Sequence, residues 1–229
     1  MSKNLTNPVK KIIIFGFGAQ LKVVLDCIKS MKNYKTIGFI SEKNTLSASK
    51  KIKYLGSIED LKKITKKHKP NDLLGVVAIG SNFIRKQIVK KVNKLNKKFR
   101  WANIIHPTAI ISKNTKIGFG NVILAGSIIC TDSIIGNHVC INTGTCIDHD
   151  NIFFDFSSTG PGVATGGNVK IGESSFLGIG STIKHNITIG KNSVIGGQSF
   201  VCNNCLPNAL YYGVPAIKIK KRSEQEEYL

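Results

Sequence analysis

An apolar residue recurs every six positions, without an insertion, from Ile105 to Val201. Of these seventeen positions, fifteen hold Ile, Leu, Val or Phe, and the other two hold Thr159 and Thr165. A small residue mostly stands two positions before the next apolar one, and Gly, Asn or Asp mostly stands one position earlier still. Self-similarity at a fixed short period is typical of chains built from stacked structural repeats.

A period of six residues fits neither an α-helix nor a continuous β-strand. On an α-helix, six residues advance by a net angle of about 240°, which would spread the apolar residues over three faces. On a continuous strand the alternate positions would also be apolar, yet they include Lys113, His149 and Glu173. A short strand followed by a corner satisfies the pattern, because Gly, Asn and Asp tolerate the left-handed backbone that corners need. Three corners close a coil of about eighteen residues, and such coils stack about 4.8 Å apart.

The first half of the chain follows a different pattern, in which apolar runs alternate with helix-like segments. The last of these segments carries an apolar stripe of Phe83, Ile84, Ile88, Val92 and Leu95. Alternating strands and helices predict a parallel sheet with covering helices. The predicted strands are 10–16, 35–40 and 73–80, and the predicted helices are 20–31, 58–68 and 82–97.

These two patterns divide the chain into an α/β, Rossmann-like domain at 1–103, an all-β parallel β-helix at 104–217 and a tail at 218–229. The net charge of +20 is concentrated in residues 1–103, which hold 24 Lys and Arg against 5 Asp and Glu. A basic half could attract nucleic acid, anionic lipid or a phosphorylated small molecule. No nucleic-acid motif accompanies the lysines, so a solvated basic surface is the favoured interpretation.

Other whole-chain features point to a cytoplasmic protein without a bound metal. No run approaches the roughly 20 apolar residues of a membrane span, and the first apolar run ends at Gly16, too early for a signal peptide. The six cysteines include a Cys202/Cys205 pair, but no second pair or nearby histidine completes a zinc site. We expect cytoplasmic location, free thiols, no metal, no membrane span and no nucleic-acid partner.

The stretches IGFGNVILAGSI, IGESSFLGIGST and IGKNSVIGGQSF resemble the hexapeptide repeats of left-handed β-helix acyltransferases. With the opening IIIFGFGAQLKVVLD and the closing GVPA at 213–216, the chain is similar to bacterial sugar acetyltransferases. The closest resemblance is to UDP-4-amino-sugar N-acetyltransferases of bacillosamine synthesis and to sialic-acid O-acetyltransferases. The resemblance implies a left-handed coil, acetyl-CoA as co-substrate, a nucleotide sugar as acceptor and a homotrimer with active sites between subunits.

Acetyl transfer needs a base, a donor for the developing oxyanion and alignment of the reactants. His149 is flanked by Asp148 and Asp150, and a carboxylate can orient an imidazole and stabilise its cation. The resemblance makes His149 the general base and Asp150 its supporting acid, although an aspartate also stands at the equivalent corner position 132. Gly167 comes one coil after His149, and the resemblance gives its backbone N–H to the thioester oxygen. We expect His68, His106 and His138 at the surface.

The resemblance also implies where the two substrates bind. Ser158 stands where the family usually has a second histidine, and a serine cannot serve as a cation or second base. Coenzyme contacts are expected at Ser158, Gly167, Ile179, Gly180, Gly197 and Pro215.

The nucleotide sugar is expected at the ends of the first three strands and at one corner of the coil. A glycine turn that opens a helix presents free amides to phosphate, although a tight turn without ligand stays open for Gln20, Ser41 and Glu42. The expected contacts are Gly16, Gly18, Ala19, Gln20, Ser41, Glu42, Gly80, Asn82 and Asn142.

Together these features predict an acetyl-CoA-dependent N-acetyltransferase that acts on the amine of a nucleotide-linked deoxyamino sugar in surface glycan biosynthesis. Two alternatives stay open. The acceptor could be a hydroxyl, as in O-acetyltransferases of sialic-acid-like sugars, or the chain could be an inactive trimeric scaffold.

Overall fold

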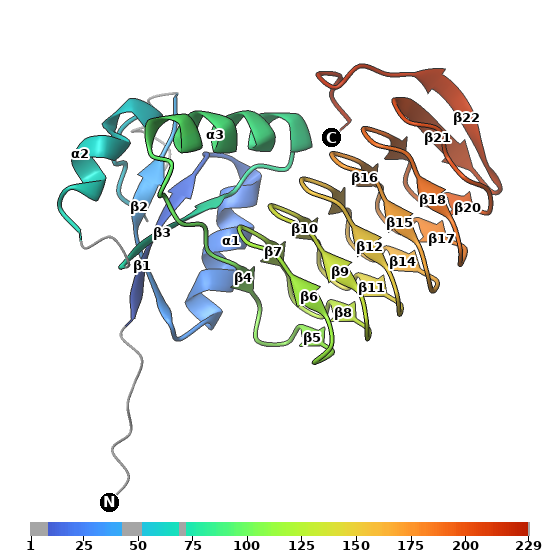
Figure 1. Cartoon of the computed structure of the whole chain (residues 1–229), viewed down its shortest axis with the longest axis horizontal. Helices are drawn as coiled ribbons and strands as arrows, with labels where there is room; N and C mark the ends of the chain where they lie inside the picture. Colours follow the sequence, from blue (N-terminus) through green and yellow to red (C-terminus); the bar gives the residue numbers. More distant parts are fainter. Residues whose placement is uncertain (1–8, 43–51, 69–71, 229) are drawn as a thin grey trace, which may run out of the picture.

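The computed structural model describes residues 9–42, 52–68 and 72–228, and these form an α/β layer followed by a long coil (Figure 1). Lys3, one of the basic residues that precede the first apolar run, lies outside the described residues. In the described part of the chain, no helix has both the length and the apolar character needed to cross a membrane.

The N-terminal layer is a parallel sheet of three strands in the order β2-β1-β3, as the alternating pattern predicts. Its one difference in element type is at 58–68, where a 3-10 turn and a short helix replace the longer predicted helix. The strands are β1 (Lys10–Phe15), β2 (Tyr34–Ile40) and β3 (Leu73–Val77), and the helical elements are α1 (Ala19–Ser30), η1 (Ile58–Asp60), α2 (Leu61–Thr65) and α3 (Asn82–Leu95).

Helix α3 begins at a side-chain cap, because the Ser81 hydroxyl accepts a hydrogen bond from the N–H of Ile84. Its fully buried residues are Asn82, Arg85, Val89 and Val92. The predicted apolar stripe is therefore only partly correct, since Ile84 is exposed while two polar residues are buried. Tertiary contacts with the coil, described below, explain this reversal.

The second half is a three-sided parallel β-helix, which confirms the fold predicted from the six-residue period. Strand partners are offset by eighteen residues, as in the pairs of Ile104 with Val122 and Ile110 with Ile128. The first sheet holds β4 (Ile104–Ile105), β7 (Val122–Ile123), β10 (Cys140–Ile141), β13 (Ser158–Thr159), β16 (Phe176–Leu177) and β19 (Val194–Ile195). The second holds β5 (Ile110–Ile111), β8 (Ile128–Ile129), β11 (Cys146–Ile147), β14 (Ala164–Thr165), β17 (Thr182–Ile183) and β20 (Phe200–Val201). The third holds β6 (Lys116–Ile117), β9 (Ile134–Ile135), β12 (Ile152–Phe153), β15 (Lys170–Ile171) and β18 (Thr188–Ile189).

The corners adopt the left-handed backbone that the sequence predicts. Every sixth residue from Gly120 to Gln198 has a positive φ, and this includes His138 and Phe156, with φ of 54° and 60°. Such values are unfavourable for bulky side chains. The stacking of the coils therefore sets the corner geometry even where the local residue opposes it.

Repeated apolar residues fill the interior of the coil, and the two threonines that interrupt them are both hydrogen-bonded. The Thr159 hydroxyl accepts from the N–H of Asn142 at 2.9 Å, and the Thr165 hydroxyl accepts from the N–H of Asp148 at 3.3 Å. A buried hydroxyl needs such a partner to offset its lost hydration. Each threonine thus supports a corner that carries a predicted site residue.

The end of the coil is covered by an antiparallel hairpin of β21 (Ala209–Gly213) and β22 (Ala216–Lys221), with β21 pairing to β19. Strand β22 extends four residues beyond the expected domain boundary at 217. From Arg222 the chain turns back, and its last part lies near the coil-facing end of α3 (Figure 1).

The first sheet also joins the two halves of the molecule. Outward-facing Ile104, Val122 and Cys140 pack in one apolar cluster with Leu21 and Val24 of α1. Arg85 adds a polar anchor, because its buried guanidinium donates to the carbonyl oxygens of His138 and Phe156, both at 2.9 Å. This packing leaves the later strands of the first sheet to line a cavity.

Candidate active site

The corners between the second and third sheets form a column that we call the His149 edge, made of residues 148–151, 166–169 and 184–187. The imidazole is exposed, and its Nδ1 lies 2.7 Å from Oδ2 of Asp150. The Asp148 carboxylate accepts the backbone N–H of His149 at 2.8 Å and so fixes the corner. The hydrogen bond to Asp150 and the charges of Asp148 and Asp132 raise the pKa of His149 above its usual value. The arrangement leaves Nε2 free to take a proton.

Gly167 lies directly beside the His149 ring, as the eighteen-residue spacing predicts. A Cβ at position 167 would stand 2.5 Å from Cε1 and 2.6 Å from Nε2 of the imidazole, far inside van der Waals contact. Among the residues that the structure describes, the Gly167 N–H has no acceptor. A proton acceptor and a free amide donor therefore stand side by side on one edge.

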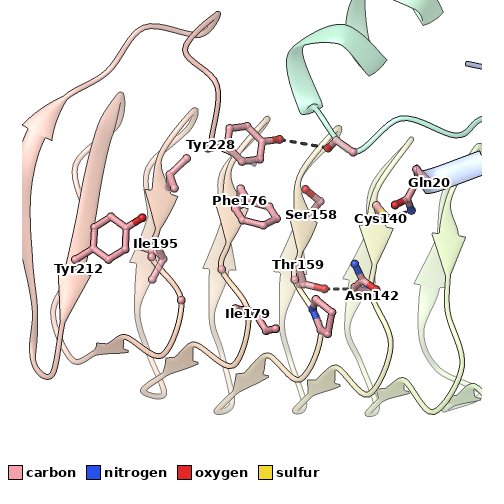
Figure 2. Close-up of a pocket in the computed structure, with 17 residues that line it drawn as sticks. Gln20, Cys140, Asn142, Ser158, Thr159, Phe176, Ile179, Ile195, Tyr212 and Tyr228 are labelled. Atoms are coloured by element: carbon pink, nitrogen blue, oxygen red, sulfur yellow. Dashed lines mark hydrogen bonds between the residues drawn. The ribbon is translucent and has the colours of Figure 1, made fainter. Parts of the chain in front are cut away.

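A cavity of about 280 Å³ lies along the first sheet, on a different side of the coil from His149, and we call it the main cavity. Figure 2 shows it running from Gln20, in the first turn of α1, to Tyr212 in the C-terminal hairpin. It brings together predicted residues from both halves of the chain. These are Gln20, Gly80, Asn142, Ser158, Ile179 and Gly197.

The N–H groups of Ile179 and Gly197 are available to a ligand at the coil side of the main cavity. Both residues stand at the second position of a corner, as His149 and Gly167 do, and neither N–H has an acceptor within the described ranges. Such amides can bind carbonyl groups of an extended ligand. Of the other predicted coenzyme contacts, Gly180 lies at the same corner as Ile179, while Pro215 lies at the tip of the hairpin and does not line the cavity.

Asn82 differs from its prediction as a substrate contact, because its polar atoms are all used inside the protein. The side chain is 1% exposed. Its amide nitrogen donates to the carbonyl oxygens of Ser174 and Ser175, and its Oδ1 accepts from Ser158 at 2.7 Å and from Arg85. The residue joins α3 to the coil and leaves no free group for a sugar.

Three of the remaining predicted substrate residues line a second cavity, of about 390 Å³, at the carboxyl ends of β1, β2 and β3. Gly16, Ser41 and Glu42 line it, and Glu42 lies 3.7 Å from the ammonium group of Lys91. The carboxyl ends of parallel strands are a common place for nucleotides. Gly18 and Ala19 are exposed at the uncapped start of α1, outside both cavities.

His138 contradicts its expected surface position. It is 2% exposed, stacks on Phe156 at 5.2 Å and meets Trp101 and Phe119 edge-on. Neither ring nitrogen has a hydrogen-bond partner within the described part of the chain. Burial, followed by the charge of Arg85, lowers the pKa of His138 to about 4, so the ring is neutral and belongs to the junction of the two halves.

Sequence reasoning missed the aromatic residues of the main cavity. Phe176 follows Ser158 by eighteen residues on the outward side of the first sheet, so the repeat itself contains a signal for it. Tyr228 comes from the C-terminal tail, where the sequence gives no periodic signal. Its phenol lines the cavity next to Phe176, with ring centroids 4.6 Å apart.

Comparison with known proteins finds a matching domain family for each half of the chain. Residues 11–92 match the PglD N-terminal domain, and residues 159–203 match the bacterial transferase hexapeptide (six repeats). The UDP-N-acetylbacillosamine N-acetyltransferase of Bacillus subtilis (strain 168) is 31% identical over 115 residues. This match spans 49% of this chain and half the length of the curated relative (50%).

Two solved structures are similar over nearly their whole length. A mutant of perosamine N-acetyltransferase from Caulobacter crescentus, in complex with CoA and GDP-perosamine, is 28% identical, with a TM-score of 0.86 over 93% of this chain and 98% of that one. The acetyltransferase domain of PglB from Neisseria gonorrhoeae FA1090, in complex with acetyl coenzyme A, is 26% identical, with a TM-score of 0.83 over 92% and 99%.

Proposed function

We propose that this chain transfers acetyl groups from acetyl-CoA to the amine of a nucleotide-linked deoxyamino sugar. It belongs to the bacterial sugar acetyltransferases, which have an N-terminal Rossmann-like domain and a left-handed β-helix of hexapeptide repeats. The similar proteins support this substrate class. One is an N-acetyltransferase of a UDP-linked sugar by name, and another is crystallised with CoA and GDP-perosamine.

The observation that carries the proposal is the pairing of His149 with Asp150 beside the free amide of Gly167. In the reaction, the amine nitrogen attacks the carbonyl carbon of the thioester. A C–N bond forms, the C–S bond breaks, and coenzyme A leaves as the thiolate. His149 Nε2 takes the proton that the amine loses and can return it to the thiolate. The Gly167 N–H stabilises the oxyanion, a contribution typically of about 3–4 kcal/mol.

The coenzyme and the acceptor need a site larger than the His149 edge provides. The main cavity supplies one, with free amides and apolar walls, but its lining within the described residues holds no histidine, carboxylate or ammonium group. The base and the cavity thus complement each other while lying on different sides of one coil. We therefore propose that His149 of one subunit faces the main cavity of a neighbouring subunit in a homotrimer.

The outward face of the second sheet supports this assembly. Along the stack it presents Ile110, Ile128, Cys146, Ala164, Thr182 and Phe200, none of them charged. The third sheet carries Lys116 and Lys170 at corresponding positions. Ile110 is 64% exposed in the single chain, and exposed apolar rows of this kind mark subunit contacts.

The assay that tests the function supplies acetyl-CoA with a panel of UDP-, GDP- and dTDP-linked 4-amino sugars. We expect acetylation of at least one amine, and His149→Ala should reduce kcat by at least about a thousand-fold while the trimer stays intact, because the base is lost. Near-normal turnover of that variant would refute the mechanism. An acetyl product released by mild alkali would identify an ester and favour a hydroxyl acceptor. Absence of acetyl-CoA binding by calorimetry would favour the scaffold interpretation.

A further inference from the structure

The C-terminal tail is fastened across the junction of the two halves by several polar contacts. The Arg222 guanidinium donates to Asn192, at 3.0 Å to its carbonyl oxygen and 2.6 Å to its side chain. Lys86 of α3 lies 2.8 Å from Glu224 of the tail and 2.9 Å from Glu173 of the coil. These contacts fix the course of the tail before its last described residue.

Tyr228 ends this course inside the main cavity. Its hydroxyl accepts the backbone N–H of Asn82 at 2.7 Å and donates to the carbonyl oxygen of Gly80 at 3.4 Å. Its ring packs on Phe176, and the Arg222 guanidinium stands 5.4 Å from its centroid. One side chain therefore holds the turn after β3 and forms a wall of the cavity.

The two ends of the main cavity have different neighbours (Figure 2). Gln20 lies at the end nearest the N-terminal domain, which holds the second cavity at the ends of β1 and β2. Tyr228 lies between Gln20 and Tyr212, where its ring packs on Phe176. Tyr212, in the C-terminal hairpin, lies at the opposite end near Ile195. A ligand anchored in the N-terminal domain therefore passes Tyr228 before it reaches Tyr212.

We infer that Tyr228 is a positioning residue for the acceptor sugar, which forms a wall of the main cavity and fixes the Gly80–Asn82 turn against it. This inference rests on the proposed function. The inference implies an acceptor sugar with an apolar group toward the rings of Tyr228 and Phe176. A deoxy sugar with a methyl group in place of the hydroxymethyl group provides one. A hydroxyl placed there would lose its hydration without gaining a partner.

The test compares steady-state kinetics of Tyr228→Ala and Tyr228→Phe with wild type, using the active nucleotide-linked amino sugar from the panel. For Tyr228→Ala we expect the KM for the acceptor to rise about ten-fold, while the KM for acetyl-CoA changes less than about two-fold. Tyr228→Phe keeps the ring but loses the hydrogen bond to Asn82, so its acceptor KM should rise by a smaller factor. The wild-type preference for a methyl over a hydroxymethyl acceptor should shrink in Tyr228→Ala.

Tyr212→Ala is the matched control, because it removes the same kind of side chain from the end of the same cavity that lies farthest from the N-terminal domain. We expect it to change the KM for acetyl-CoA more than the KM for the acceptor. An acceptor KM that stays unchanged or falls in Tyr228→Ala would overturn the inference, and a fall would identify Tyr228 as a plug. If wild type acetylates no amino sugar of the panel, the proposed function fails instead. Tyr228→Phe separates both outcomes from misfolding, because it keeps the packing on Phe176.

Discussion

The hydrogen bond between His149 and Asp150 affects the pH range in which the His149 imidazole can accept a proton. Because it raises the pKa of the imidazole, the wild-type enzyme should lose activity as the pH falls through that raised value and the ring becomes charged. Asp150→Asn removes the carboxylate, so we expect its acid limb to move to lower pH and its kcat at neutral pH to fall about ten-fold to a hundred-fold.

A pH profile of kcat measures this shift directly, and Asp132→Asn is the control, because that carboxylate acts on His149 only through its charge. The control should show a smaller shift in the same direction. A profile of Asp150→Asn that superimposes on wild type would show that Asp150 is only a corner residue, the alternative suggested by the aspartate at the equivalent position 132.

At the scale of elements, the junction between α3 and the coil should make stability depend on pH through His138. Its pKa is lowered to about 4 by burial and by Arg85, with Asp155 opposing, while an unfolded histidine titrates near 6.5. The stabilisation is therefore complete above about pH 6.5 and is lost as the pH falls toward 4, because the unfolded chain binds the proton first. We expect this histidine to reduce the free energy of unfolding by about 2–3 kcal/mol between pH 7 and 4.

Denaturant unfolding of wild type and His138→Phe at several pH values tests this effect. Phenylalanine keeps the aromatic stack, and Phe156 already adopts the same positive φ one coil further along. The difference in unfolding free energy between the two proteins should change with pH. A constant difference from pH 7 to 4 would mean that His138 takes up its proton without disturbing the junction.

At the scale of the whole molecule, the separation of His149 from the main cavity predicts complementation between subunits. His149→Ala lacks the base, and Gly197→Trp should fill the cavity, so each variant alone should be inactive. In mixed trimers with random composition, a site built from two subunits would be intact about a quarter of the time. Coexpression with two affinity tags, followed by the acetylation assay, should recover that fraction of activity. Mixed trimers without activity would show that base and cavity belong to one chain.

Much of the fold was predictable because it depends on local rules. Each six-residue unit contains its own interior residue and its own corner residues, so the period alone predicts the strands, the corners and an eighteen-residue coil. The same spacing predicted that Gly167 would lie against His149, since neighbours along a stack differ by one coil. The strands of the first half were also predictable, because buried parallel strands read as apolar runs.

The sequence by itself determined the coil, the α/β domain and the contact between an imidazole and a glycine. Only the tertiary structure decided which polar residues serve the junction. Asn82 and Arg85 are buried because the coil offers them carbonyl acceptors, and no local pattern encodes a partner fifty or more residues away. Tyr228 lines the cavity for the same reason, because the tail reaches α3 only after the coil has set the distance between them.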